Sequence, residues 1–364
     1  MHISTTFSFY LGRQFLFWFA AVFFVLLALI FVFDVLELLR RMSSRPQSGI
    51  GLAIEMGLLR ASEMARRIVP FAVLFGALLG FWRLNRNHEF VVARAAGVSA
   101  WQFLMPAIVA AILIGAFKMA VFSPFAATLF LRYEQMEARY LEGRASLLAV
   151  SPTGLWLRQA GADGRAIVHA KRLAAQTMEF SEVTIYRFSA TDRFTGRIDA
   201  PRARLEDGYW LLRDAQVTSA EGVPRNVETY RFATNLTPNT IHDSFARPET
   251  MSFWSLPAFI NQLEDAGFSG LRHRLFWHAQ LADPLLLFAM VLIAATFSLR
   301  PARRGRTGVV LVAGIATGFL VYVVSDIVFA LGLSARIPVV LAAWTPATVT
   351  TLLGLAMLFH LEDG

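Results

Sequence analysis

The sequence predicts an α-helical membrane protein with six transmembrane helices, arranged three and three around an inserted all-β domain. Two observations carry this prediction. Of the 364 residues, 56% are hydrophobic and only 16% are charged, and the mean hydropathy is +0.51, far from a typical soluble domain. Apolar runs long enough to cross a bilayer lie in both the first and the last third of the chain, whereas its middle is charged and strand-like.

The overall charge limits the possible partners. The formal net charge is +8 and the pI is near 10.4, but the arginines are scattered instead of forming one stripe. This pattern argues against nucleic acid and favours anchoring at a surface of anionic lipid. The chain has no cysteine, which excludes a disulfide framework and a cysteine-based zinc site.

The first three transmembrane helices are expected within residues 1–125. Residues 15–33 are an unbroken apolar run, and the charged rim after them, with no small-x-small site, argues against a cleaved signal peptide. Residues 54–82 form one long helix that is charged in its first half and apolar in its second. Residues 101–122 form the third span.

A short polar stretch, residues 83–99, separates the second and third spans. Its single acid lies among basic residues, and a glycine stops it: the side chains of note are Arg83, Arg86, Glu89, Phe90, Arg94 and Gly97. The connection at residues 300–306 is even more basic, with four arginines and no acid. By the positive-inside rule, both connections face the cytoplasm.

An inserted domain is expected over residues 126–268, where charged residues return and short alternating runs are separated by turn residues. Several short strands at this spacing predict an antiparallel sandwich or jelly roll. An amphipathic helix is expected after them, at residues 255–265. The predicted strands are residues 154–159, 166–173, 182–188, 209–217 and 227–234.

The apolar pattern resumes in residues 269–364. Three further spans are expected at residues 276–299, 309–333 and 337–359. With the two basic connections inside, both termini are cytoplasmic and the β domain is exported.

The motifs of common catalytic sites are absent from this sequence. It contains no GxxxxGK[ST] phosphate loop, no HExxH and no GxSxG, so we expect neither a cofactor nor a metal site. His278 with Asp283 is the best catalytic-looking pair, but a helix-packing contact is the more ordinary use of such residues in a membrane. Arg40, Arg41 and Arg45 lie just beyond the first span, where they could bind phosphate groups or simply anchor the helix at the interface.

The order of several short runs resembles a known family. Residues 70–80 (PFAVLFGALLG) lead into Glu89-Phe-Val-Val and Ala96-Gly97, and the insert carries residues 146–148 (SLL), 154–156 (GLW) and 234–238 (TNLTP). With the three–insert–three topology, the chain resembles the LptF/LptG permeases of lipopolysaccharide export over nearly its whole length, and their LptG branch more closely.

The resemblance implies a transport subunit of an ABC transporter and not an enzyme. Its partners would be an LptF-type permease, a dimer of the LptB ATPase and an LptC-type protein. Together they would extract lipopolysaccharide from the inner membrane and pass it to a periplasmic bridge. Residues 83–99 would be the coupling helix, with Arg86, Glu89, Phe90, Arg94 and Gly97 at the ATPase.

In the same resemblance, Arg40 and Arg41, with Arg45 beside them, would face the lipid phosphates. Asp34 departs from the cationic character of some relatives, which puts the geometry of those phosphate contacts in question. Two other functional classes stay open. One is a lipid-modifying membrane enzyme that uses His278 and Asp283, and the other is a passive scaffold that needs no ATPase.

Overall fold

The computed structural model describes residues 5–42, 49–142, 148–151, 154–161, 164–174, 179–189, 191, 193–206, 208–220, 222–234, 247–265, 269–299 and 307–362. The chain divides into two compact units. The helical unit comprises Met1–Leu141, Glu249–Trp254 and Arg274–Gly364. The β unit comprises Glu142–Pro248 and Ser255–His273.

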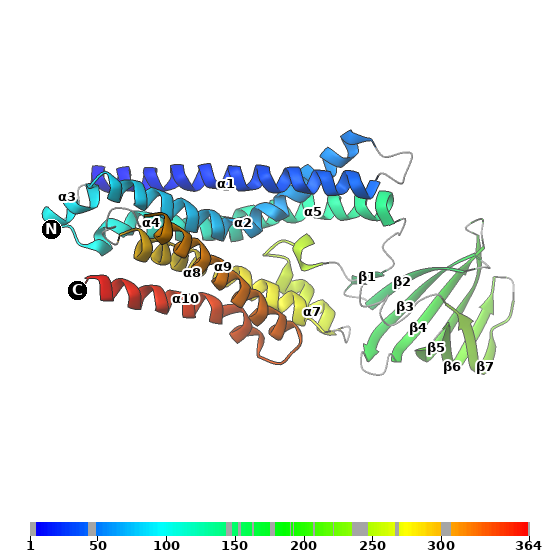
Figure 1. The fold of residues 1–364 in the computed structure, drawn as a ribbon. Coiled ribbons are helices and arrows are strands. Elements are labelled where there is room, and N and C mark those ends of the chain that lie inside the picture. The colour runs from blue at the N-terminus through cyan, green and yellow to red at the C-terminus, as the bar shows by residue number, and fades with distance from the viewer. Residues whose placement is uncertain are drawn as a thin grey trace. The chain divides into compact units, whose positions relative to one another are not determined.

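The helices run in the order shown in Figure 1, with two π-helical turns (η1 and η2) and one 3-10 turn (η3). Their bounds are α1 Thr5–Met42, α2 Ile50–Arg86, α3 Glu89–Ala95, α4 Ala100–Phe117, η1 Lys118–Phe122, α5 Ser123–Glu137, η2 Ala138–Glu142, η3 Pro248–Thr250, α7 Leu256–Asp265, α8 Leu271–Ser298, α9 Thr307–Leu333 and α10 Val339–Glu362.

Among the described residues, six helical segments are long and apolar enough to cross a membrane, which confirms the six predicted spans. The third is longer than expected, because it continues from α4 through η1 and α5 to Leu141 instead of ending near residue 122. The pair Ser123-Pro124 reads as a helix boundary in the sequence. Pro124, however, falls in the first turn of α5 directly after η1, where a missing backbone donor is tolerated.

Small residues let the helices of this unit approach closely. A Cβ atom at Gly76 of α2 would lie 2.7 Å from Phe19 Cα of α1, so the helix face that bears Gly76 and Gly80 meets the backbone of the first span. Gly115 of α4 meets α8 in the same way, because its Cβ would lie 2.6 Å from Pro284 Cα. At both places only glycine leaves room for the neighbouring backbone.

One end of the helical unit gathers several element ends around α3, as Figure 1 shows. The Tyr10 hydroxyl near the start of α1 donates to Glu89 of α3, and Asn85 at the end of α2 donates to the Ser298 carbonyl at the end of α8. The rings of Trp101 in α4 and Phe359 in α10 are 5.5 Å apart. We call this region the α3 end.

The β unit contains one seven-stranded antiparallel sheet in which the strands follow one another in chain order. It contains every strand that the sequence predicted, and Figure 1 shows the strands side by side. The strands are β1 Leu148–Ser151, β2 Gly154–Gly161, β3 Gly164–Ala174, β4 Glu179–Phe188, β5 Phe194–Glu206, β6 Tyr209–Ser219 and β7 Arg225–Ala233.

Two details of the β domain differ from the expectation. The described strands form a single up-and-down sheet instead of two stacked sheets or the Greek-key order of a jelly roll, because each short connection places a strand beside its predecessor. No strand was predicted at the short β1 or at β5, where Pro201 interrupts an arginine-rich run. Pro201 has no pairing partner in the register of either neighbouring strand, so its missing N–H costs no ladder hydrogen bond.

The sheet bends over its own core. Phe180 of β4 and Trp210 of β6 meet edge to face at 4.7 Å, and both are fully buried. The buried Gln159 of β2 accepts hydrogen bonds from Trp210 Nε1 and Thr234 Oγ1 and donates to the Ala233 carbonyl. These contacts join strands that are not neighbours in the sheet. Leu263 of the expected amphipathic helix α7 packs into the same core.

Candidate functional site: the α3 end and the arginine rim

The polar stretch 83–99 folds into a defined turn–helix–turn. His88 takes a left-handed conformation with φ of 60° between α2 and α3, and Gly97 does so with φ of 85° after α3. Ser99 then caps α4 in a capping box with Gln102. The glycine at position 97 is therefore required by the backbone, because other residues are strained in that conformation.

Side chains of α3 fix the helix to the spans beneath it. Phe90 is only 6% exposed and meets the Phe103 ring of α4 edge to face at 5.1 Å, and Ala93 is buried beside it. Phe90 is thus part of the core, so its contribution to any docking surface is to hold the helix in place. The sequence alone did not show this, since Phe90 is followed by the apolar Val91 and Val92 and no local pattern indicates which of them is buried.

Glu89, the single acid of the stretch, is held by two donors. Tyr10 of α1 donates its hydroxyl to Glu89 Oε1 at 3.3 Å, and the Asn87 amide donates to the same oxygen at 3.3 Å. Glu89 therefore links α3 to the first span. Sequence reasoning missed Tyr10, because no local pattern joins a residue in α1 to a loop after α2.

The outer face of α3 is apolar and basic. Val91 and Val92 are exposed, Val92 to 66%, as are Arg94, Ala95 and Ala96 on the same short helix. The guanidinium of Arg86 lies over the Trp82 ring at 5.4 Å, and that of Arg94 lies over Phe90 at 5.8 Å. Exposed valines flanked by arginines make a small surface suited to a protein groove with acidic groups at its rim.

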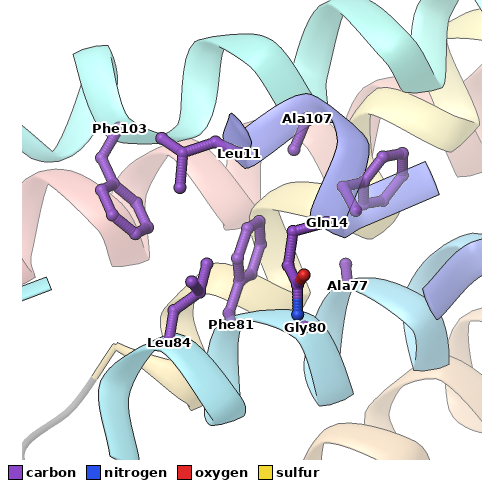
Figure 2. A pocket seen from close by; sticks show the side chains of 9 residues that line it. Leu11, Gln14, Ala77, Gly80, Phe81, Leu84, Phe103 and Ala107 are labelled. Carbon is purple, nitrogen blue, oxygen red and sulfur yellow. The ribbon is translucent and has the colours of Figure 1, made fainter. Parts of the chain in front are cut away.

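The packing below α3 is tight. A cavity of only about 10 Å³ lies between α1, α2 and α4, and Figure 2 shows the side chains that surround it. Leu11, Phe81, Leu84 and Phe103 enclose it, with the Gln14 amide beside Gly80. A space of this size barely admits one water molecule, so α3 rests on a rigid base.

The arginine rim at the end of α1 is already partly neutralised. Arg40 and Arg41 both donate to Glu37, at 2.8 and 3.0 Å, and Arg41 also lies 3.6 Å from Glu137 of α5. Arg40 remains 75% exposed and Arg41 is about half exposed, so both can still reach a ligand. Arg45 lies outside the described residues.

Asp34 has a structural partner of its own. It forms an ion pair with Arg60 of α2 at 2.7 Å, and both side chains are largely buried. This pair joins α1 to α2. It gives Asp34 a structural role at a position where the resemblance implied basic residues.

The proposed catalytic pair is not assembled. Asp283 forms a 2.7 Å ion pair with Lys118 of η1, and the structure records no contact between Asp283 and His278. The His278 ring lies against Trp277 instead. Within the part of the chain that the structure describes, no group of three His, Cys, Asp or Glu residues could hold a metal ion. The geometry thus gives no support to an enzyme at this position.

Comparison with known proteins places the chain in a family. The family described as "Lipopolysaccharide export system permease LptF/LptG" matches residues 9–360. The chain belongs to this permease family. It is similar to the lipopolysaccharide export system permease protein LptG of Escherichia coli K12, with 26% identity over 360 residues, covering 96% of this chain and 97% of that protein.

Another relative supports the same branch. The LptG permease of Haemophilus influenzae is 26% identical over 290 residues, covering 76% of this chain and 77% of that protein. The permease is therefore LptG-like, a multi-pass membrane protein and a transport subunit of its family, as the resemblance implied.

Proposed function

We propose that this permease extracts lipopolysaccharide from the inner membrane and passes it to a periplasmic bridge, driven by an ATPase that docks on α3. The observation that carries the proposal is α3 itself, a short helix with an exposed apolar face whose acid is bonded to the first span. The chain has no phosphate loop, so energy must come from a partner.

The partners that we propose are an LptB-type ATPase dimer, an LptF-type permease and an LptC-type protein. The exposed Arg83, Arg86 and Arg94 at the α3 end support a cytoplasmic position for it. The start of α1 and the end of α10 contact elements of the same end, which supports cytoplasmic termini and a periplasmic β domain.

Affinity purification of the full chain from native membranes tests the docking. We expect an ATPase dimer to accompany it, and we expect Val92→Glu to lower its recovery at least about tenfold by placing a charge in an apolar contact. Val223→Glu, at an exposed valine of the β unit, is the matched control and should retain the ATPase. An unchanged yield from Val92→Glu, or no ATPase with the unaltered chain, contradicts the proposal.

The second proposal is that Arg40 and Arg41 contact lipid phosphates. With benzoylphenylalanine at the exposed Leu36, we expect charge reversal at both arginines to lower photo-crosslinking to lipopolysaccharide about threefold or more. Glu37→Gln should raise it, because both guanidinium groups then lose the Glu37 carboxylate, although Arg41 keeps Glu137 nearby.

Arg13→Glu provides the control, since Arg13 is exposed on the same helix near its other end. It should leave crosslinking at Leu36 unchanged. Equal crosslinking in the Arg40 and Arg41 variants and in the Arg13 variant would assign the rim to plain interfacial anchoring.

A further inference from the structure

Four adjacent strands of the β unit share a line at which the alternation of buried and exposed residues slips by one. Each strand crosses this line with two successive exposed residues, where a regular strand alternates. The register of the strand pairs skips one residue of each strand at the same line. We call this line the crease, and its skipped residues are Lys171 of β3, Glu182 of β4, Pro201 of β5 and Asp214 of β6.

The backbone at the crease is held in an unusual conformation. Glu182 has a φ of 51° and Asp214 a φ of 53°, values that residues other than glycine rarely adopt. They are two of the four such residues in the part of the chain that the structure describes. Backbone strain of this kind is concentrated at ligand-binding and catalytic sites, so the crease is a candidate for one.

An open pocket of about 590 Å³ lies along the crease. Residues of β3, β4, β5 and β6 line it, and Figure 1 shows these strands side by side. Its volume is within the range of about 300–1,000 Å³ that small-molecule sites have. The polar side chains at its wall are His169, Lys171, Glu182, Thr184, Asp199, Asp214 and Gln216.

A row of aromatic and polar side chains leads across the sheet into this pocket. Successive strands pair Trp156 with His169, then Thr184, Asp199 and Gln216. Residues that are directly opposite each other project from the same face of a sheet. The contacts agree with this, because the rings of Trp156 and His169 are 4.2 Å apart and the Thr184 hydroxyl donates to Asp199 at 2.8 Å.

Asp199 is held in a fixed orientation within this row. Its Oδ1 accepts from the Thr184 hydroxyl and from Nε and Nη2 of Arg197, at 2.8, 2.8 and 2.6 Å. All three bonds reach the same oxygen, so Oδ2 is the one that can accept from a ligand. Gln216 is exposed beside it, and its amide can both donate and accept.

The charges of the pocket argue against an anionic ligand. One basic and three acidic side chains line it, a formal sum of −2. Lys171 is paired with Glu182 at 2.9 Å, which leaves a phosphate or carboxylate without a cation of its own. A cationic amine only donates hydrogen bonds, so it would leave the Gln216 amide donors unmatched. Within the described residues, no group of three His, Cys, Asp or Glu residues could hold a metal ion.

We propose that this face of the β unit binds a neutral oligosaccharide. Sugar hydroxyls both donate and accept, so one ring can donate to Asp199 Oδ2 and accept from the Gln216 amide. The C–H face of another ring is apolar and can cover the half-exposed Trp156 ring. Three strand spacings separate Trp156 from Asp199, about 14 Å, so a single ring cannot contact both.

Two sources carry this chemistry, the saccharide of the transported lipid and the glycan of the cell wall. Both require the β unit to be periplasmic, as proposed above. Saccharide binding itself is measured without transport, so its failure is distinguishable from a failure of docking at α3 or of lipid contact at the arginine rim.

Isothermal titration of the purified full chain tests the inference with two probes. Chitotetraose, a neutral saccharide of four rings, represents the cell-wall glycan, and the lipid-free saccharide of lipopolysaccharide represents the cargo. We expect saturable binding of at least one, which also identifies the source. Gln216→Leu should lower its affinity about twofold to tenfold by removing hydrogen bonds. Trp156→Ala should lower it by a similar factor, and Trp156→Phe, which keeps an aromatic ring, should retain most of it.

Asn261→Leu is the matched control, because Asn261 is an exposed amide on α7 of the same unit and does not line the pocket. It should leave the affinity unchanged. If Trp156→Ala fails to fold, Gln216→Leu decides the result, since Gln216 is exposed. Saturable binding of trilysine and of neither saccharide would assign the pocket to a basic peptide and overturn the inference. Binding of neither probe, or binding that Gln216→Leu leaves unchanged, also overturns it.

Discussion

Replacing Asp283 with leucine is expected to destabilise the permease by about 3–5 kcal/mol, because it leaves the Lys118 ammonium buried without its carboxylate. The two side chains are largely buried and join η1 to α8, next to the close backbone approach of Gly115 and Pro284. Thermal unfolding of the purified protein in detergent micelles measures the effect.

The double variant Lys118→Met with Asp283→Leu should recover most of this loss, since it removes both charges together. Glu37→Gln provides the comparison, because it breaks a solvent-exposed pair, which contributes little to stability. If the Asp283→Leu variant unfolds at a temperature no lower than the Glu37→Gln variant does, the Lys118–Asp283 pair does not stabilise the protein.

Reversing the charge of Glu89 is expected to separate ATP hydrolysis from lipid release. Glu89→Arg repels the arginines of its own stretch and loses the bonds from Tyr10 and Asn87, although the protein should still insert. Release per ATP hydrolysed should therefore fall severalfold while ATP hydrolysis continues. Reconstituted vesicles in which both rates are followed provide the measurement.

Two further variants sharpen this experiment. Glu55→Arg reverses an exposed acid elsewhere on α2 and should leave the ratio of release to hydrolysis unchanged. Tyr10→Phe removes only the hydroxyl that joins α1 to Glu89, and we expect a smaller loss than with Glu89→Arg. Normal release from Glu89→Arg would remove Glu89 from the coupling path.

The sequence was sufficient for the features that repeat along the chain. Apolar runs of bilayer length predicted all six spans, and alternation predicted five strands. The short β1 and also β5 were missed; at β5, Pro201 and several arginines hide a strand whose proline occupies an unpaired position. The third span continues past its predicted end near residue 122. Pro124 looks like a helix end in the sequence, but it falls in the first turn of α5.

The partners of the charged residues could not be predicted. Asp34 meets Arg60, Lys118 meets Asp283 and Tyr10 meets Glu89 only after distant segments pack together. Helical spacing accounts for the local pair of Glu63 with Arg67, because residues four apart share a helix face. The burial of Phe90 likewise depends on α4, which no local pattern reveals.

The continuity of α2 has a mechanical consequence. This helix of 37 residues is about 55 Å long, and it runs from the segment that bears Arg60 and Arg66 to the turn that bears α3. Pro70 lies inside this helix, where one backbone hydrogen bond is missing and bending is easiest. Pro70 also lines the cavity of about 350 Å³ between α2, α8 and α9. A force applied at α3 would therefore bend α2 beside that cavity.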